Sequence, residues 1–248
     1  MLKQLERKLI CPVSGNKLYL DDSNNFFKVK DRDIEYPIDG RIIDFLPEEE
    51  KGHTNALKEY RKSLEDQIKD VGSHFKMPDK FIDTLVEVPA DISNFAIEKY
   101  RKLKQTTMLV VDENMDFLME AERKAKELGI DGIYFLHCSF DKLPVADKIA
   151  GLAISILGLS RVKGKGEAIA EIHRVLKVSG TLLGIFFINH LKEIDALKEK
   201  GIYLEAFKGK EEIKGFLDKK FDIAGEKEIG SKYLIDGRKR WPSCGVKY

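Results

Sequence analysis

The apolar positions between residues 81 and 248 form two kinds of pattern. Continuous runs rich in β-branched and aromatic residues occupy residues 84–88, 107–112, 133–138, 151–157 and 181–188. Such runs are typical of strands buried on both faces, as in a parallel sheet. Between them, apolar residues recur at helical spacing, most clearly at 114–128 and 167–177. This alternation predicts an α/β fold, a doubly wound Rossmann-like sheet that is mostly parallel.

The two ends of the chain differ from this central pattern. LYL at 18–20 and FFKV at 26–29 flank the turn-rich DDSNN, which predicts a small antiparallel β module at the N-terminus. The helical spacing in ALKEYRKSLEDQIKDV predicts a helical connector or lid. Near the C-terminus, FDIAGEKEIGSKYLIDGRKR predicts two strands that turn at Gly230 and form an antiparallel edge. We therefore expect a β module at 1–47, a connector at 48–80 and an α/β domain at 81–248.

Charge and composition narrow the class of protein. The 43 basic and 42 acidic residues give a net charge of +1, so binding to nucleic acid through a global positive field has no support. The start of the chain is not signal-peptide-like and no 18-residue apolar stretch occurs, so we expect no membrane segment and a cytoplasmic location. Cys11, Cys138 and Cys244 show no CxxC spacing, which predicts free thiols. The sequence specifies no oligomeric state.

The stretch LVEVPADISNFAIEKY, residues 85–100, reads as a strand, a tight turn and a helix, and it contains no glycine. Glycine is usual in such a turn where the backbone approaches a ligand. Two interpretations remain open. The turn is either structural, with Asp91 or Ser93 capping the helix, or a ligand-binding turn with altered chemistry.

Four further segments carry a family resemblance. They are VVDENMDFLMEAERKAKELGI, FLHCSFDKLPVAD, AISILGLSRV and EIHRVLKVSGTLLGIFFI. In this order they resemble the second to fifth strands of the class I S-adenosylmethionine-dependent methyltransferases, especially the branch that acts on small molecules. The turn described above then takes the place of the first strand and its GxGxG loop.

The resemblance implies S-adenosylmethionine as cofactor, a small-molecule substrate and a set of contact residues. Asp112, with Glu113 beside it, takes the ribose position. The remaining implied contacts are Pro89, Ala90, Asp91 and Ser93 near the methionine moiety, Ser139 and Phe140 near the adenine, and Ile156 in the substrate-facing segment. Pro89, Asp91 and Ser93 stand where the family has its loop glycines, so two functions remain open: a methyltransferase, or a non-catalytic ligand- or partner-binding protein on the same scaffold. Asp112 itself is also compatible with a simple helix N-cap.

Residues 9–47 resemble the zinc-ribbon-like module that often precedes bacterial methyltransferases. That pattern, CPxC…CxxC…YPIxDGIPDFLP, here reads CPVS…VKDR…YPIDGRIIDFLP. Ser14, Val29 and Arg32 replace three of the four cysteines, and one remaining thiol at Cys11 does not make a tetrahedral site. We expect no zinc, and expect apolar packing to replace it through Tyr36, Ile38, Ile42 and Phe45.

The sequence names no catalytic residue, because methyl transfer from a sulfonium needs mainly positioning and desolvation. Four polar side chains are expected near the crevice and are candidates for substrate contact or for a base, namely His74, His137, Asn189 and His190. His173, in the helical AEIHRVLK, is expected to be packed rather than catalytic.

Overall fold

The computed structural model describes residues 2–30, 32–46, 77, 81–90, 95–101, 103, 106–188 and 205–240. Several expectations fall outside these residues: the connector at 48–80 apart from Met77, and His74, Asp91, Ser93, Asn189, His190 and Cys244.

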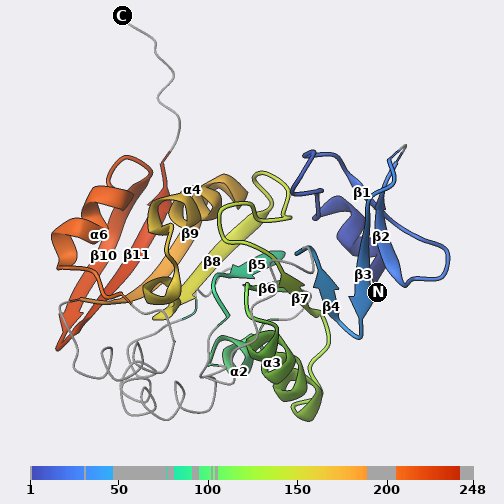
Figure 1. Ribbon diagram of the computed structural model, residues 1–248. Helices are drawn as coiled ribbons and strands as arrows, with labels where there is room; N and C mark the ends of the chain where they lie inside the picture. The colour runs from blue at the N-terminus through green and yellow to red at the C-terminus, as the bar shows by residue number, and fades with distance from the viewer. Residues whose placement is uncertain are drawn as a thin grey trace, which may run out of the picture.

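Within the described residues, eleven strands form one mixed sheet in the order β1-β2-β3-β4-β7-β6-β5-β8-β9-β11-β10 (Figure 1). Their bounds are β1 Leu18–Leu20, β2 Phe26–Val29, β3 Glu35–Asp39, β4 Ile42–Asp44, β5 Thr84–Glu87, β6 Thr107–Asp112, β7 Ile133–His137, β8 Ala150–Ile156, β9 Leu176–Phe187, β10 Phe221–Ile229 and β11 Lys232–Lys239. From β4 to β9 all neighbours are parallel, whereas β9, β11 and β10 are antiparallel. The predicted α/β class, the parallel centre and the antiparallel edge are confirmed.

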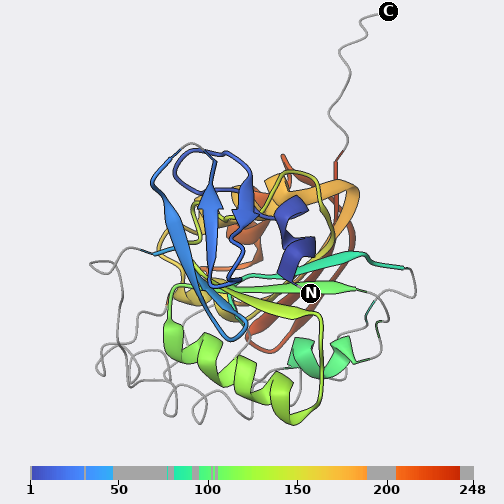
Figure 2. The same ribbon diagram turned by 90° about the vertical axis from the view of Figure 1, so that its right-hand side faces the viewer.

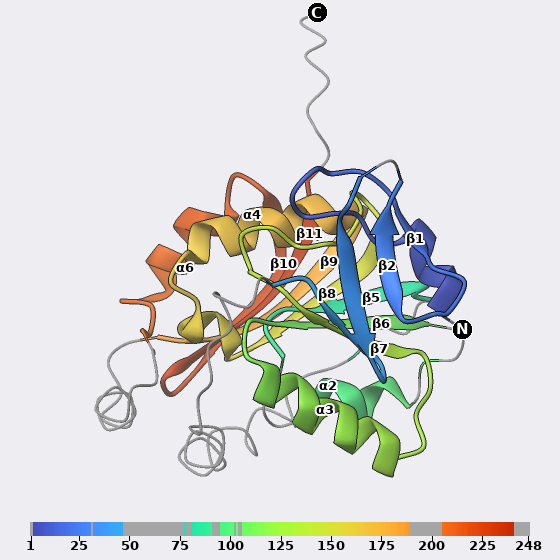
Figure 3. The same ribbon diagram turned by 45° about the vertical axis from the view of Figure 1, so that its right-hand side comes forward.

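The central strands are buried on both faces, which explains their continuous apolar runs. Along β6, Met108 and Val110 belong to one apolar cluster and Leu109 and Val111 to the other. The first cluster lies against α2 (Phe95–Tyr100) and α3 (Met115–Glu127), and the second against α4 (Lys165–Val175), α6 (Lys210–Leu217) and the N-terminal module. Figure 2 shows α3 and the module on opposite sides of the sheet, and Figure 3 shows α4 and α6 together on the side away from α3.

The helix after β6 begins with an asparagine cap. The side chain of Asn114 accepts hydrogen bonds from the N–H groups of Asp116 and Phe117, as an N-cap residue does. Asp112 is therefore not the N-cap of α3, which removes the simplest structural explanation for its carboxylate.

The N-terminal module combines antiparallel and parallel pairing. A short 3-10 helix, η1 (Leu2–Arg7), precedes the β1-β2-β3-β4 meander, and β4 then pairs in parallel with β7, with Asp44 opposite His137. An isolated bridge joins Leu9 to Val145, and Ala146 N–H donates to the Lys8 carbonyl at 2.8 Å. The module thus extends the parallel sheet at β7 and packs over the sheet face beside it.

The C-terminal hairpin turns at Gly230, whose φ of +55° is the left-handed conformation that glycine adopts readily. The prediction for this hairpin is confirmed. By contrast, the expected helix 167–177 ends at Val175, and β9 begins at once with Leu176, well before residue 181.

Candidate cofactor site

The carboxyl ends of three central strands meet at one edge of the sheet. Asp112 closes β6 and pairs with His137 at the end of β7, while Glu87 closes β5 opposite Val110 and Ile154. Ligands of open α/β sheets bind at this edge. The sequence predictions for Asp112 and His137 place both at this edge, and the structure brings them together.

The Asp112 carboxylate is 1% exposed and is surrounded by donors. Oδ2 accepts from Arg161 Nη2 at 2.7 Å and from Ala90 N–H at 3.2 Å. Oδ1 accepts from Asn114 N–H at 2.9 Å, with Arg161 Nη1 at 3.4 Å. Both oxygens that would receive the ribose hydroxyls are occupied by groups of the chain itself.

Arg161 lies in the segment 156–161 that the resemblance places toward the substrate, but the sequence did not single it out as a partner of Asp112. It ends the 3-10 helix η3 (Gly158–Arg161) after β8, its side chain is 8% exposed, and its guanidinium lies over the Phe117 ring at 4.2 Å. Besides Asp112, Nη2 donates to the Ala90 carbonyl at 3.0 Å. Arg161 therefore ties the end of β6 to the turn after β5, through contacts that no local sequence pattern could indicate.

The glycine-free turn is packed from within. An added Cβ on Gly158 would lie 2.7 Å from Pro89 Cδ, so the proline ring sits directly against the start of η3. The next N–H, that of Ala90, donates to the Val111 carbonyl at 2.8 Å as well as to Asp112. Pro89 and Ala90 thus directly follow β5, and they make contacts within the protein.

Ser139 and Phe140, the residues expected near the adenine, both face the carboxylate of Glu113 with a hydrogen-bond donor. Glu113 Oε1 accepts from Phe140 N–H at 3.1 Å and from Ser139 Oγ at 3.0 Å. The Ser139 hydroxyl lies 2.5 Å from Asp141 Oδ1 too, so its one hydrogen serves one of two carboxylates. The structure thus brings Glu113, expected at the ribose, together with Ser139 and Phe140, where its carboxylate accepts the Phe140 N–H.

His137 is fully buried and held at both ring nitrogens. Nδ1 lies 2.8 Å from Asp44 Oδ1, and Nε2 lies 3.1 Å from the Glu113 carbonyl oxygen. Both neighbours are hydrogen-bond acceptors, so a ring nitrogen that carries hydrogen donates to the one that it faces. His137 therefore joins β4 of the N-terminal module to the β6–α3 turn.

Two residues from the apolar runs, Ile156 and Glu87, complete this edge of the sheet. Ile156, expected at the substrate side, is 1% exposed and packs in the same cluster as Ala90 and Leu157. Glu87 was not singled out from the sequence, although it is also 1% exposed. Its signal was present as a carboxylate inside the otherwise apolar run TLVEV.

Cys11 and Ser14, two of the positions to which the zinc-ribbon resemblance assigns cysteines, make contacts within the module. Cys11 Sγ lies 3.0 Å from the Tyr36 hydroxyl and accepts from Ser14 N–H at 3.3 Å, while the Tyr36 and Phe45 rings lie 4.6 Å apart. Burial raises the pKa of Cys11, but the hydrogen bonds from Ser14 and Tyr36 outweigh it and leave the pKa below its usual value. Across the described ranges, no three His, Cys, Asp or Glu side chains are grouped to hold a metal ion.

Two other side chains considered in the sequence analysis, His173 and Cys138, are partly and fully buried. His173 stacks edge-on against Phe221 at 5.4 Å, and burial, with Lys239 and Lys220 nearby, lowers its pKa to about 4. Cys138 is buried, and that burial raises its pKa well above the ordinary value. Packing of His173 is confirmed.

These contacts decide how well the crevice fits S-adenosylmethionine. The ribose-side carboxylate is paired with Arg161, the adenine-side N–H with Glu113, and Pro89 has no N–H to offer. In the arrangement of the described residues, Asp112, Glu113 and Ser139 are engaged with other groups of the chain, and this arrangement of the three does not fit the cofactor. Asp91 and Ser93 lie outside the described residues. No helix among the described residues is long and apolar enough to cross a membrane.

Comparison with solved structures identifies the same fold in methyltransferases. One chain of the complex between the Haloferax volcanii Trm112 methyltransferase activator and a putative methyltransferase superposes with a TM-score of 0.61 at 18% identity, covering 75% of this chain and 96% of that one. An Aquifex aeolicus S-adenosylmethionine-dependent methyltransferase gives 0.58 at 12% identity, covering 76% and 100%. The geranyl diphosphate C-methyltransferase of Streptomyces coelicolor gives 0.57 at 15% identity, covering 76% and 85%.

Sequence comparison provides the assignment to a family. No curated protein matches the chain. The sequence profile of the ubiE/COQ5 methyltransferase family, however, matches residues 57–199, more than half of the 248 residues. Together with the methyltransferase fold, this match shows that the chain belongs to the ubiE/COQ5 methyltransferase family.

Proposed function

We propose that this chain is a non-transferring member of its family, a ligand- or partner-binding protein in which the cofactor crevice is held closed by its own side chains. The observation that supports the proposal is the ion pair between Arg161 and Asp112, with 8% and 1% of the side chains exposed. In this pair, Arg161 occupies the carboxylate of Asp112, to which the family resemblance assigns the ribose.

The energetic cost of opening the crevice favours this function. Separating a buried ion pair costs about 3 to 5 kcal/mol, which corresponds to roughly two to four orders of magnitude in affinity. A site that would otherwise bind in the micromolar range is thereby moved toward millimolar affinity. Ribose hydroxyls are neutral and cannot replace the charge of the guanidinium.

The methionine side adds to this cost. Pro89 removes one backbone donor, and its ring lies against Gly158, where an added Cβ would approach Cδ to 2.7 Å. The space beside the first turn is thus filled by protein atoms.

A second candidate function is methyl transfer to a small molecule by S-adenosylmethionine. Its support is the pair of buried carboxylates, Glu87 and Asp112, at adjacent strand ends, together with the family membership. This function requires Arg161 to leave Asp112 when the cofactor enters.

The deciding experiment is a calorimetric titration of the purified chain with S-adenosylmethionine and S-adenosylhomocysteine. We expect affinity weaker than micromolar, and little difference between the wild type and Asp112→Ala. Asp116→Asn, a neighbouring carboxylate at the start of α3, serves as the matched control.

Low-micromolar binding that Asp112→Ala abolishes and Asp116→Asn retains would overturn the proposal and support methyl transfer. Arg161→Gln adds a second readout. If the guanidinium blocks the ribose, this variant binds the cofactor more tightly than the wild type, provided that thermal unfolding confirms it is folded.

A further inference from the structure

A pocket lined by charged side chains lies at the amino ends of the parallel strands, opposite the edge that carries Asp112 and His137. It has a volume of about 710 Å³, within the range of small-molecule sites. Its walls come from η1 and from the amino ends of the parallel strands: Asp83 and Thr84 at β5, Ile149 before β8, and Lys177 in β9.

The charge of this pocket contrasts with the balanced charge of the chain. Lys3, Arg7, Lys8, Lys148 and Lys177 line it, against Glu6 and Asp83, an excess of three positive charges where the whole chain carries only +1. Cations gathered in a hollow focus the field and raise the local concentration of anions.

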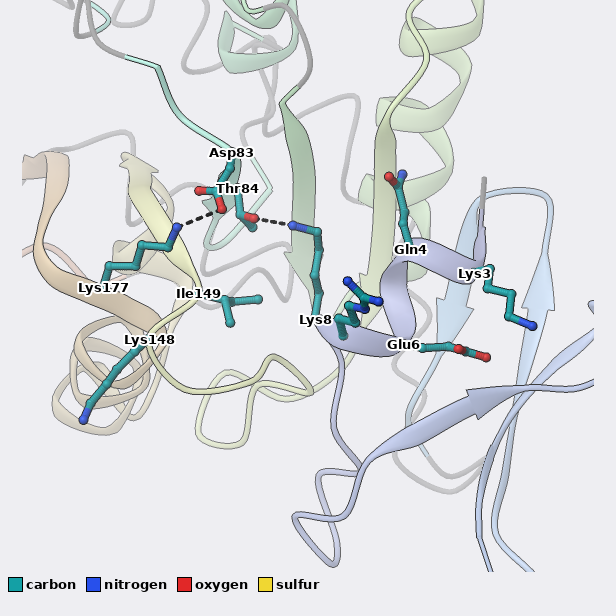
Figure 4. Close-up of a pocket in the computed structure, with 10 residues that line it drawn as sticks. Lys3, Gln4, Glu6, Lys8, Asp83, Thr84, Lys148, Ile149 and Lys177 are labelled. Carbon is teal, nitrogen blue, oxygen red and sulfur yellow. Dashed lines mark hydrogen bonds and ion pairs between the residues drawn. The ribbon is translucent and has the colours of Figure 1, made fainter.

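The central lysines are positioned by the fold. Lys8 Nζ donates to Thr84 Oγ1 at 2.5 Å, and Lys177 Nζ lies 2.8 Å from Asp83 Oδ2. Figure 4 shows these two lysines reaching inward from opposite sides, with Ile149 between them. A lysine ammonium has three donors, so each of these contacts leaves donor capacity for a ligand.

The backbone around the pocket is fixed as well. The Lys8 carbonyl accepts from Ala146 N–H at 2.8 Å, and Ile149 N–H donates to the Val175 carbonyl at 2.9 Å. Burial lowers the pKa of Lys8, and the charge of Lys177 lowers it further while Asp83 opposes this. An anion beside Lys8 would compensate for the solvation that the partly buried ammonium has lost.

We propose that this pocket binds a compact phosphorylated small molecule, with the phosphate between Lys8 and Lys177. Lysine binds phosphate as a point charge. Asp83 lines the pocket and can accept a hydrogen bond from a hydroxyl group of the same ligand, and Ile149 offers an apolar surface. The balanced charge of the whole chain favours a compact anion over the extended backbone of a nucleic acid.

The test is a calorimetric titration of the full chain with pyrophosphate and with ribose 5-phosphate at low and high salt. We expect saturable binding that weakens with salt. Lys8→Gln and the double variant Lys148→Gln/Lys177→Gln are each expected to weaken binding by about tenfold or more. Lys219→Gln, at an exposed lysine outside the pocket, is the control and is expected to leave affinity unchanged.

The double variant changes only partly buried or exposed side chains, so it tests the pocket even if Lys8→Gln impairs folding. No binding of either probe at about 10 mM would overturn the proposal. Equal affinities in wild type and the double variant would overturn it too, as would mixed-sequence duplex DNA that binds more tightly than both probes and displaces them.

Discussion

Arg161 Nη2 lies 2.7 Å from Asp112 Oδ2, and these two side chains are 49 residues apart in the sequence. A removed partner in such a buried pair leaves an uncompensated charge. Arg161→Met is therefore expected to lower the free energy of unfolding by about 3 to 5 kcal/mol. Adding Asp112→Asn should recover much of this loss, because the second charge is then gone. Urea unfolding of the single and double variants measures the coupling.

The control for this cycle is Arg123→Met on the exposed side of α3, where Arg123 lies 2.7 Å from Glu120 with 56% of its side chain exposed. Exposed pairs contribute less than about 1 kcal/mol. If both arginine variants lose the same small amount, the Arg161 pair is not the buried structural contact described above.

Gly158→Ala tests the packing of the turn after β5. A Cβ at this position would approach Pro89 Cδ to 2.7 Å, and overpacking of this kind costs about 1 to 3 kcal/mol. Gly215→Ala is the matched control, since Gly215 lies within α6 and a Cβ there meets nothing within 4 Å. That variant is expected to gain about 0.5 to 1 kcal/mol. Thermal unfolding of both variants should shift in opposite directions.

The N-terminal module is expected to keep its fold without metal. Incubation with a chelator should leave the unfolding midpoint unchanged, and elemental analysis should find less than one zinc per chain. Tyr36, which is 6% exposed, packs beside Cys11, so Tyr36→Ala is expected to cost about 2 to 5 kcal/mol. Tyr36→Phe removes only the contact with Cys11 and should cost about 1 kcal/mol. A stoichiometric zinc whose removal unfolds the module would contradict this.

His173 gives the protein a defined acid sensitivity. Its pKa in the fold is lowered to about 4, from an ordinary value of 6.5, so the native state favours the neutral ring. Between these values the unfolded chain binds a proton that the native state does not, and stability falls as the pH drops through 6.5 toward 4. The ring is only partly buried, so we expect about 1 kcal/mol after solvent screening.

The measurement for His173 is urea unfolding at pH 7 and pH 5 for the wild type and His173→Gln. The carboxylates contribute equally in both proteins, so the variant should lose less stability on acidification. Identical losses would exclude this role for the ring.

The central sheet was predictable because burial on both faces leaves a strong local signal. Residues 107–112 were expected as a strand and form β6 with the same bounds. The start of β9 was not predictable in this way. Leu176 and Lys177 continue the helical pattern in the sequence, but Ser179 adopts a φ of +60° and pairing with β8 extends the strand back to Leu176.

The sequence predicted the position of the candidate site, but it did not predict the contacts within the site. Parallel strands bring Asp112 and His137 to one edge by topology alone, whatever they bind. The partners of those residues depend on long-range contacts. Asp44 reaches His137 from the N-terminal module, and Arg161 reaches Asp112 from η3, which follows β8. A single arginine outside the long helices and strands belongs to no periodic pattern from which such a contact could be predicted.

The parallel pairing of β4 with β7 also sets an order of events during synthesis. Asp44 meets His137, which follows it by 93 residues, so β4 cannot complete its contacts until the residues up to β7 have left the ribosome. At about 5 to 20 residues per second this delay is roughly 5 to 20 seconds. During that interval the hydrogen-bonding edge of β4 has no final partner, and the nascent chain must keep it from pairing with other strands.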